Sequence, residues 1–268
     1  MHPIERLRYV ARASGGDQRM LVRETAGAIR GLQFEPAGLV IAARRIVERH
    51  PTSGPLWWFC SSLLTSSDPF DACYRLANEV EADPTPDHLF DLLPDDATVC
   101  LIGWPDLIGD AVMRRGDIRV LAIDADDEGS SFVRRLQRAD IEAEIVPPGG
   151  AAAAAVAADI VLIEAMATAP ADVLATPGSR ALASVGYCSE VPTWLVAGRG
   201  RRLPQPLFTT MATRIADRRV PWDADAEPMP LALFSTVVGP NGAVPADTAG
   251  VLDPECPMAH ELVRPSPM

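Results

Sequence analysis

The chain has 268 residues, of which 48% are apolar and 22% are charged, a balance typical of a globular protein of one or two domains. All 24 cationic side chains are arginines, which excludes a Schiff-base lysine, a pyridoxal phosphate anchor and a P-loop lysine. The net charge of −12 argues against nucleic acid as the main partner, because phosphate binding requires a basic face.

The charge is distributed unevenly along the chain. Residues 1–50 carry nine arginines and five acids, whereas the remainder carries fifteen arginines and thirty-one acids. Solvated helix faces, or an attraction between the two halves, would explain this pattern, and so would an N-terminal surface for an acidic partner. The use of arginine alone, with many alanines and 25 prolines, also suggests a GC-rich bacterial genome.

Apolar residues recur with a period of 3.6 residues in the first third of the chain, which predicts helices there. Pro36 opens one of these helices and His50-Pro51 closes it. Asp68-Pro69 supplies an N-cap followed by proline at the first helical position of another. We therefore expect an all-helical domain over residues 1–94.

After residue 94, short apolar runs alternate with helical stretches, a pattern that predicts a parallel sheet with right-handed crossovers. The expected fold class is α/β, with the helical N-terminal part followed by a Rossmann-like parallel-sheet domain over residues 95–253. A last apolar run, Leu231–Val238, predicts a closing strand, and the proline-rich residues 254–268 predict a flexible tail. The five earlier strands are expected at Thr98–Gly103, Ile118–Ile123, Glu142–Val146, Ile160–Glu164 and Thr193–Ala197.

The five cysteines are odd in number and widely spaced, and no secretory signal precedes them, so free thiols in a reducing cytoplasm are expected. No apolar run reaches the roughly 20 residues that a membrane span needs. The histidines and cysteines show none of the close spacings of zinc ligands, so no metal is expected.

Ligands of an open parallel sheet bind beyond the carboxyl ends of its strands. Gly103 and Gly109 do not complete the glycine fingerprint of a dinucleotide site, so no cofactor is expected. Asp124 opens an acidic loop that continues through Asp126 and Asp127. Paired carboxylates there could bind magnesium, but a solvated helix N-terminus explains them as well.

A glycine- and arginine-rich loop, Gly198–Arg202, follows the expected strand Thr193–Ala197. Its three arginines could hold a phosphorylated ligand through bidentate contacts, or the loop is exposed and pairs with the surrounding acids. No nucleophile is predicted, because Cys100 falls inside a strand and no G-x-S-x-G turn is present.

Five segments, in the right order, resemble the motifs of one family. His50–Trp57 resembles an R-P-T-x-x-x-L-[FW] helix start, and Ala158–Ala165 an A-D-x-V-[IL]-V-G-A strand. The other three segments are Gly178–Ala183, Val191–Ala197 and Pro230–Pro245. On these residues the chain resembles the family that joins the translation initiation factor 2B regulatory subunits, the methylthioribose-1-phosphate isomerases and the ribose-1,5-bisphosphate isomerases. The resemblance implies a helical part before a Rossmann-like domain, and a homodimer or larger even assembly.

The positions that match the family's catalytic residues carry no acid or base. The resemblance places Gly103 where the family has its catalytic cysteine and Met166 where it has its catalytic aspartate, and neither side chain transfers protons at neutral pH. His50 replaces the arginine of the first motif. The phosphate-contacting arginine is missing near residues 126–127, which removes a fork that would clamp a phosphate.

The resemblance and these departures together imply a protein that has lost isomerase chemistry and binds a ligand, such as a sugar phosphate or nucleotide, or a protein partner. The alternative is a sugar-phosphate isomerase that uses displaced residues such as His50, Asp124 or Glu164. Glu164 is the one weak catalytic candidate, because it precedes Met166 by two residues and shares its strand face. The candidate ligand-binding residues are His50, Thr52, Gly103, Trp104, Asp124, Glu164, Met166, Gly178, Ser179, Arg180 and Arg199.

Overall fold

The structure is a computed structural model, and it describes residues 17–31, 36–125, 128–217 and 220–264. Several parts of the sequence interpretation lie outside the described residues. They are residues 1–16 and 32–35 of the expected helical domain, Asp126 and Asp127 of the acidic loop, residues 218–219 of the expected sheet domain, and residues 265–268 of the expected tail.

The first part of the chain is helical, as the 3.6-residue period predicts. Asp68 accepts a hydrogen bond from the backbone N–H of Asp71, which confirms the N-cap expected there. Ser53 caps the preceding helix in the same way through the N–H of Leu56. The helices are α2 (Gln18–Arg30), α3 (Pro36–Arg49), α4 (Gly54–Leu64), α5 (Pro69–Glu81) and α6 (Thr85–Leu92).

The second part of the chain is a mixed, mostly parallel sheet, and the expected α/β class is confirmed. Its main path has the order β3-β2-β1-β4-β6-β8-β9. The first five pairings along that path are parallel, including the predicted pairing of β1 with β2, and β9 closes the path as an antiparallel partner of β8. The strands are β1 (Thr98–Ile102), β2 (Arg119–Ile123), β3 (Glu142–Val146), β4 (Ile160–Thr168), β6 (Thr193–Val196), β8 (Thr236–Gly239) and β9 (Gly242–Pro245).

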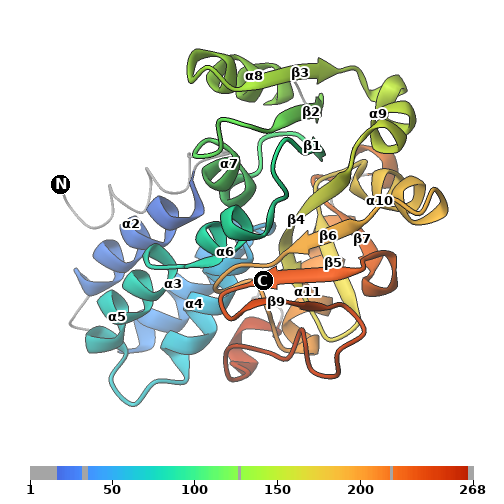
Figure 1. Ribbon diagram of the computed structural model, residues 1–268. Coiled ribbons are helices and arrows are strands. Elements are labelled where there is room, and N and C mark those ends of the chain that lie inside the picture. Colours follow the sequence, from blue (N-terminus) through green and yellow to red (C-terminus); the bar gives the residue numbers. More distant parts are fainter. Residues whose placement is uncertain (1–16, 32–35, 126–127, 218–219, 265–268) are drawn as a thin grey trace.

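Helices connect the parallel strands, and most lie where the sequence pattern places them. Figure 1 shows α2, α3, α4 and α5 gathered at one side of the molecule, with the sheet beside them. Two short strands, β5 (Asp172–Ala175) and β7 (Glu227–Pro230), extend the end of β4 through antiparallel pairing. The connecting helices are α7 (Asp106–Val112), α8 (Glu128–Arg138), α9 (Ala151–Ala157), α10 (Ser179–Cys188) and α11 (Gln205–Ala216).

The predicted strand Leu231–Val238 is wrong in its first half. Leu231–Leu233 forms a 3₁₀ turn, and the strand begins only at Thr236. The cause is a tertiary contact: the backbone N–H of Leu231 donates to the carbonyl of Ala171, which draws this segment to the start of β5.

The described part of the expected tail is not loose. Ser61 on α4 donates to the carbonyl of Pro257 at 2.6 Å and accepts from the backbone N–H of Ala259 at 3.0 Å. Cys256, Ala259 and Leu262 are buried in the same hydrophobic cluster as helices α2 to α5. Apolar side chains among the prolines therefore hold residues 254–264 against the helices.

The packing of α6 differs from that of the other helices. It lies against α7, β8 and β9, and Leu89 is buried in the cluster formed by the sheet. By packing, α6 thus belongs with the sheet, although the expected helical domain runs to residue 94. Whether the two parts are separate domains stays a prediction. None of the helices in the described ranges has the length and apolar composition that a bilayer crossing requires.

The helices meet the sheet where α4 begins. A Cβ atom on Gly54 would overlap the backbone oxygen of Met166 on β4, so only glycine allows this approach. The contact places the start of α4 directly beside the carboxyl end of β4.

We predict that Gly54→Ala lowers the free energy of unfolding by about 1–3 kcal/mol, because the added methyl group must push α4 away from a backbone atom. Urea denaturation measures the change. Gly116→Ala is the matched control, since a Cβ there meets nothing within 4 Å, and it should change stability by less than about 0.5 kcal/mol. Equal effects of the two substitutions would contradict the prediction.

Candidate functional site

A cavity of about 340 Å³ opens where the starts of α2 and α4 face the carboxyl ends of β1 and β4. This is the edge of a parallel sheet at which ligands bind. Its lining is mostly polar and contains four carboxylates and two arginines. The lining residues are Asp17, Gln18, Thr52, Pro55, Ile102, Trp104, Pro105, Asp106, Glu128, Arg135, Glu164, Met166, Thr176, Ser179 and Arg201.

A buried ion pair lies in the wall of the cavity. Arg201 Nη2 is 2.7 Å from Glu164 Oε1, and the two side chains are only 6% and 9% exposed. The other carboxylate oxygen of Glu164 accepts from the backbone N–H groups of Leu107 and Ile108, at 2.8 and 3.1 Å. Arg201 Nη1 donates to the carbonyl of Ala165. Both oxygens of Glu164 are therefore engaged within the protein.

A second carboxylate, that of Asp106 at the start of α7, faces the same space. Burial and the neighbouring negative charge of Glu164 raise the pKa of Asp106 to about 7, while Arg201 acts in the opposite direction. Asp106 also accepts a hydrogen bond from the backbone N–H of Gln18, at 3.2 Å. The Gln18 side chain in turn accepts from the hydroxyl of Ser53, at 2.5 Å.

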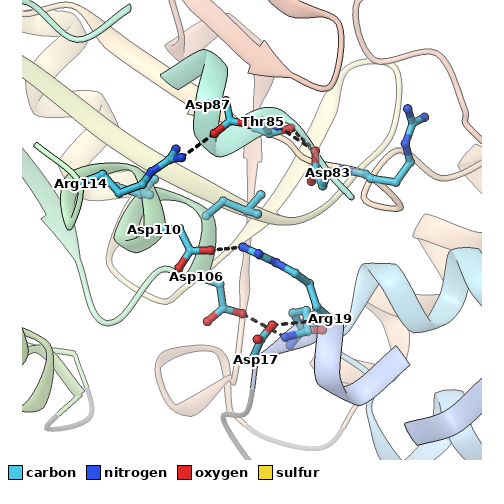
Figure 2. Close-up of polar contacts among 12 residues, drawn as sticks. Asp17, Arg19, Asp83, Thr85, Asp87, Asp106, Asp110 and Arg114 are labelled. Atoms are coloured by element: carbon cyan, nitrogen blue, oxygen red, sulfur yellow. Dashed lines mark hydrogen bonds and ion pairs between the residues drawn. The ribbon is translucent and has the colours of Figure 1, made fainter. Parts of the chain in front are cut away.

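Helices α2 and α7 are held together by polar contacts around Asp106. Figure 2 shows Asp106 and Asp110 of α7 facing Asp17 and Arg19 at the start of α2, where Arg19 forms an ion pair with Asp110. The cavity wall contributed by α2 is therefore attached to α7 through charged side chains.

An aromatic side chain covers another side of the cavity. Trp104 is 37% exposed and packs on Phe132 of α8, with the ring centroids 5.9 Å apart. The guanidinium of Arg135 lies over the Trp104 ring, 5.6 Å from its centroid, which is a cation–π distance.

Six of the predicted binding residues lie at this cavity. Five of them line it, namely Thr52, Trp104, Glu164, Met166 and Ser179. Gly103 borders it: a Cβ on Gly103 would lie 3.7 Å from Thr176 and 3.9 Å from Glu128.

The other five predicted residues are not among the lining residues. Asp124 accepts from the hydroxyl of Ser130, Arg199 forms an ion pair with Glu255, and the backbone N–H of Arg180 donates to Glu227. Gly178 adopts φ +93° directly before α10, so its role there is conformational. His50 follows the end of α3 and is half-buried.

The arginine-rich loop is not an exposed loop. Arg201 is buried against Glu164, while Arg199 and Arg202 both pair with Glu255, whose side chain is 5% exposed. The interpretation of this loop as exposed is wrong, and its arginines bind carboxylates of the same chain.

Among the lining residues, the sequence does not single out Asp106 or Gln18, and it offers Arg201 only as one of the three arginines of the Gly198–Arg202 loop. Asp106 stands in the first turn of a helix, where an acid is ordinarily explained by the helix dipole. The arginine-rich loop draws attention to Arg201 in the sequence. Its burial cannot be predicted there, because its partner Glu164 is 37 residues away.

Neither a thiol nor a metal cluster marks the site. Cys100 is fully buried in β1, inside the strand where the sequence places it, and burial raises the pKa of its thiol to about 12. Across the described ranges, no group of three or more histidine, cysteine, aspartate or glutamate side chains could hold a metal ion.

No protein-family model and no curated protein sequence matches this chain. Solved structures do match its fold. The translation initiation factor eIF-2B of Pyrococcus horikoshii OT3 superposes with a TM-score of 0.73 at 14% identity, covering 90% of this chain and 96% of that one. The eIF2B beta subunit of Chaetomium thermophilum gives 0.70 at 11% identity, covering 93% and 90%. The tetrameric eIF2B-beta2-delta2 complex from C. thermophilum gives 0.70 at 11%, covering 91% and 90%. The chain therefore has the eIF2B-like fold that the five motifs imply.

We predict that Arg201→Met destabilises the protein by about 3–5 kcal/mol, because it leaves the Glu164 carboxylate buried without its cation. The double variant Glu164→Gln/Arg201→Met should be more stable than Arg201→Met alone, since glutamine is uncharged and still accepts from the start of α7. Arg75→Ala, which breaks an exposed ion pair with Glu79, is the control and should cost less than about 0.5 kcal/mol. Urea denaturation compares all three, and a double variant less stable than the single one would refute the argument.

We also predict a pH dependence that comes from Asp106. Its pKa rises from 3.8 in the unfolded chain to about 7 in the folded protein, so the folded state binds the extra proton between these values. The free energy of unfolding therefore falls as pH rises from about 4 to about 7. Asp106→Asn should remove this loss and stabilise the protein at pH 8 by an amount on the order of 2 kcal/mol.

Thermal unfolding of both proteins across this pH range tests the Asp106 prediction. Asp87→Asn is the control, because Asp87 is exposed and its ion pair with Arg114 lies outside the cavity lining. An unchanged pH dependence in Asp106→Asn would contradict the assignment.

Proposed function

We propose that this protein is a divergent member of the initiation-factor-2B-like family that binds a small polar ligand in the cavity and has no isomerase activity. The eIF2B-like fold supports the family, and the cavity at the carboxyl edge of the sheet supports the ligand. The observation that carries the proposal is the state of Glu164, the one candidate base that the sequence offers near the vacant positions.

Glu164 is a poor general base because both of its oxygens are engaged. One oxygen holds Arg201 and the other holds two backbone N–H groups of α7. A base must reach the proton that it removes within hydrogen-bond distance, whereas Glu164 is only 9% exposed and three of its roughly four acceptor positions are occupied. Gly103 and Met166, at the two positions matched to the family's catalytic residues, cannot substitute for it.

One observation favours the alternative, a sugar-phosphate isomerase that uses displaced residues. Asp106 lines the cavity, three residues beyond Gly103, and its pKa of about 7 suits proton transfer near neutral pH. The other two displaced candidates, His50 and Asp124, are not among the lining residues. Asp106 is thus the residue on which the enzyme hypothesis depends.

We predict no turnover of ribose-1,5-bisphosphate or methylthioribose-1-phosphate by the purified protein. General acid–base groups contribute about 10²–10⁴-fold each, so the loss of both removes most of the rate. The assay includes Asp106→Asn and Glu164→Gln. Turnover that disappears in Asp106→Asn would establish the isomerase alternative with Asp106 as the acid or base, and turnover lost only in Glu164→Gln would assign that role to Glu164.

We propose that the protein forms a homodimer or a larger even assembly, largely through its sheet-bearing part. One of the structural neighbours is a tetramer of two beta and two delta eIF2B subunits. The sheet path ends in β9, where Val244 is 38% exposed, and an unpaired apolar edge is unfavourable in water.

We predict that light scattering at micromolar concentration gives at least twice the mass of one chain, which is 28.7 kDa. A protein that remains at the mass of one chain over this range would contradict the assembly proposal.

The cellular location that we infer is the cytoplasm, in keeping with five free cysteines, of which only Cys188 is exposed.

A further inference from the structure

The lining of the cavity carries an excess of negative charge. Its four carboxylates are those of Asp17, Asp106, Glu128 and Glu164, and its two cations are Arg135 and Arg201. A phosphate group would therefore enter a space whose formal charge is already negative. The free-energy cost of removing water from the phosphate would then not be offset by a net electrostatic attraction.

The arginine best placed to clamp a phosphate is already occupied. Arg201 directs one guanidinium nitrogen to Glu164 and the other to the carbonyl of Ala165. Bidentate recognition of a phosphate needs two N–H groups that face the ligand, whereas the Arg201 side chain is only 6% exposed and both of its terminal nitrogens already donate within the protein. The second arginine, Arg135, lies with its guanidinium over the ring of Trp104.

One polar group in the lining, the hydroxyl of Ser179, is buried without a hydrogen-bond partner in the part of the chain that the structure describes. The hydroxyl of Ser179, at the start of α10, is in a side chain 1% exposed, and Ser179 Oγ makes no hydrogen bond within the described part of the chain. Buried hydroxyls in native proteins are almost always hydrogen-bonded, because an unpaired one costs free energy. A ligand hydroxyl in the cavity would satisfy it.

We propose that the cavity binds a polyhydroxylated ligand that carries a primary ammonium group, in place of the phosphate that the fold's relatives among sugar-phosphate isomerases would require. The proposal rests on the ligand-binding function proposed above. The ammonium group binds near the carboxylates of Asp17 and Asp106, and a ligand hydroxyl pairs with Ser179. The part of the Trp104 indole that stays exposed beside Arg135 and Phe132 provides an apolar contact for the carbon skeleton of the ligand.

The test uses the full-length protein and sugar probes that differ in the charged group they carry. Glucosamine carries the ammonium, glucose lacks it, N-acetylglucosamine masks it, and glucose 6-phosphate and ribose 5-phosphate carry a phosphate. Isothermal titration should give glucosamine at least about tenfold tighter binding than each of the other four probes.

Two variants connect this preference to the cavity. Asp106→Asn should weaken glucosamine binding about tenfold and leave glucose binding unchanged, because it removes one negative charge and keeps the shape. Ser179→Ala should weaken glucosamine and glucose by the same factor, since it removes a hydroxyl partner that both share. Asp87→Asn, a charge change outside the cavity, should alter neither.

The outcomes separate this inference from the proposed function. A sugar phosphate that binds as tightly as glucosamine and loses affinity in Ser179→Ala would overturn the ammonium proposal while supporting a ligand-binding cavity. Equal affinities for glucosamine and glucose, or no effect of Asp106→Asn, would also overturn it. Absence of binding by all five probes would also overturn the ammonium proposal. The turnover assay would then remain as the independent test of the proposed function.

Discussion

The buried ion pair between Glu164 and Arg201 holds three elements in place, and the cavity depends on it. Glu164 belongs to β4 and also accepts from the start of α7, while Arg201 belongs to the loop that follows β6. That loop is fixed from its other side: Glu255 accepts from the backbone N–H of Gly200 and pairs with Arg199 and Arg202. Since Gly200 adopts φ +79° against Pro55, the loop also contacts the start of α4. The segment after the sheet and the first helices thus jointly determine the shape of the site.

Carboxylates of the chain itself occupy backbone N–H groups at several points around this edge of the sheet. Glu164 binds the start of α7, Glu227 binds the N–H of Arg180 at the start of α10, and Asp83 binds the N–H of Arg199 at 2.7 Å. Groups of this kind are the ones that hold phosphates in other α/β proteins. An acidic chain can therefore keep the fold while its own side chains replace an external anion.

Local signals in the sequence were sufficient for most of the architecture. Strands β1 and β2 are short apolar runs separated by a helix, and such runs specify a parallel pair without further information. The strands β5 and β7 were missed because each has only four residues, and two of those in β7 are prolines. The helix α11 was also missed. For the site, Gly103 and Trp104 directly follow a strand end and Ser179 falls in one of the five resemblance segments, and all three lie at the cavity; that they bind a ligand stays a prediction. The sequence does not indicate the raised pKa of Asp106 or the burial of Arg201, because both depend on Glu164, which is distant from each of them in sequence.

The cavity and the attachment of the first helices share one carboxylate. Asp106 lines the cavity and accepts the N–H of Gln18, while Asp110, one turn later on α7, pairs with Arg19. A hydrogen bond to an ionised carboxylate is stronger than one to its protonated form. A cationic group beside Asp106 would offset the cost of ionising this buried carboxylate, which is the cost that lowers stability as pH rises. A cation bound in the cavity and the attachment of α2 to α7 would consequently be linked through one carboxylate, that of Asp106.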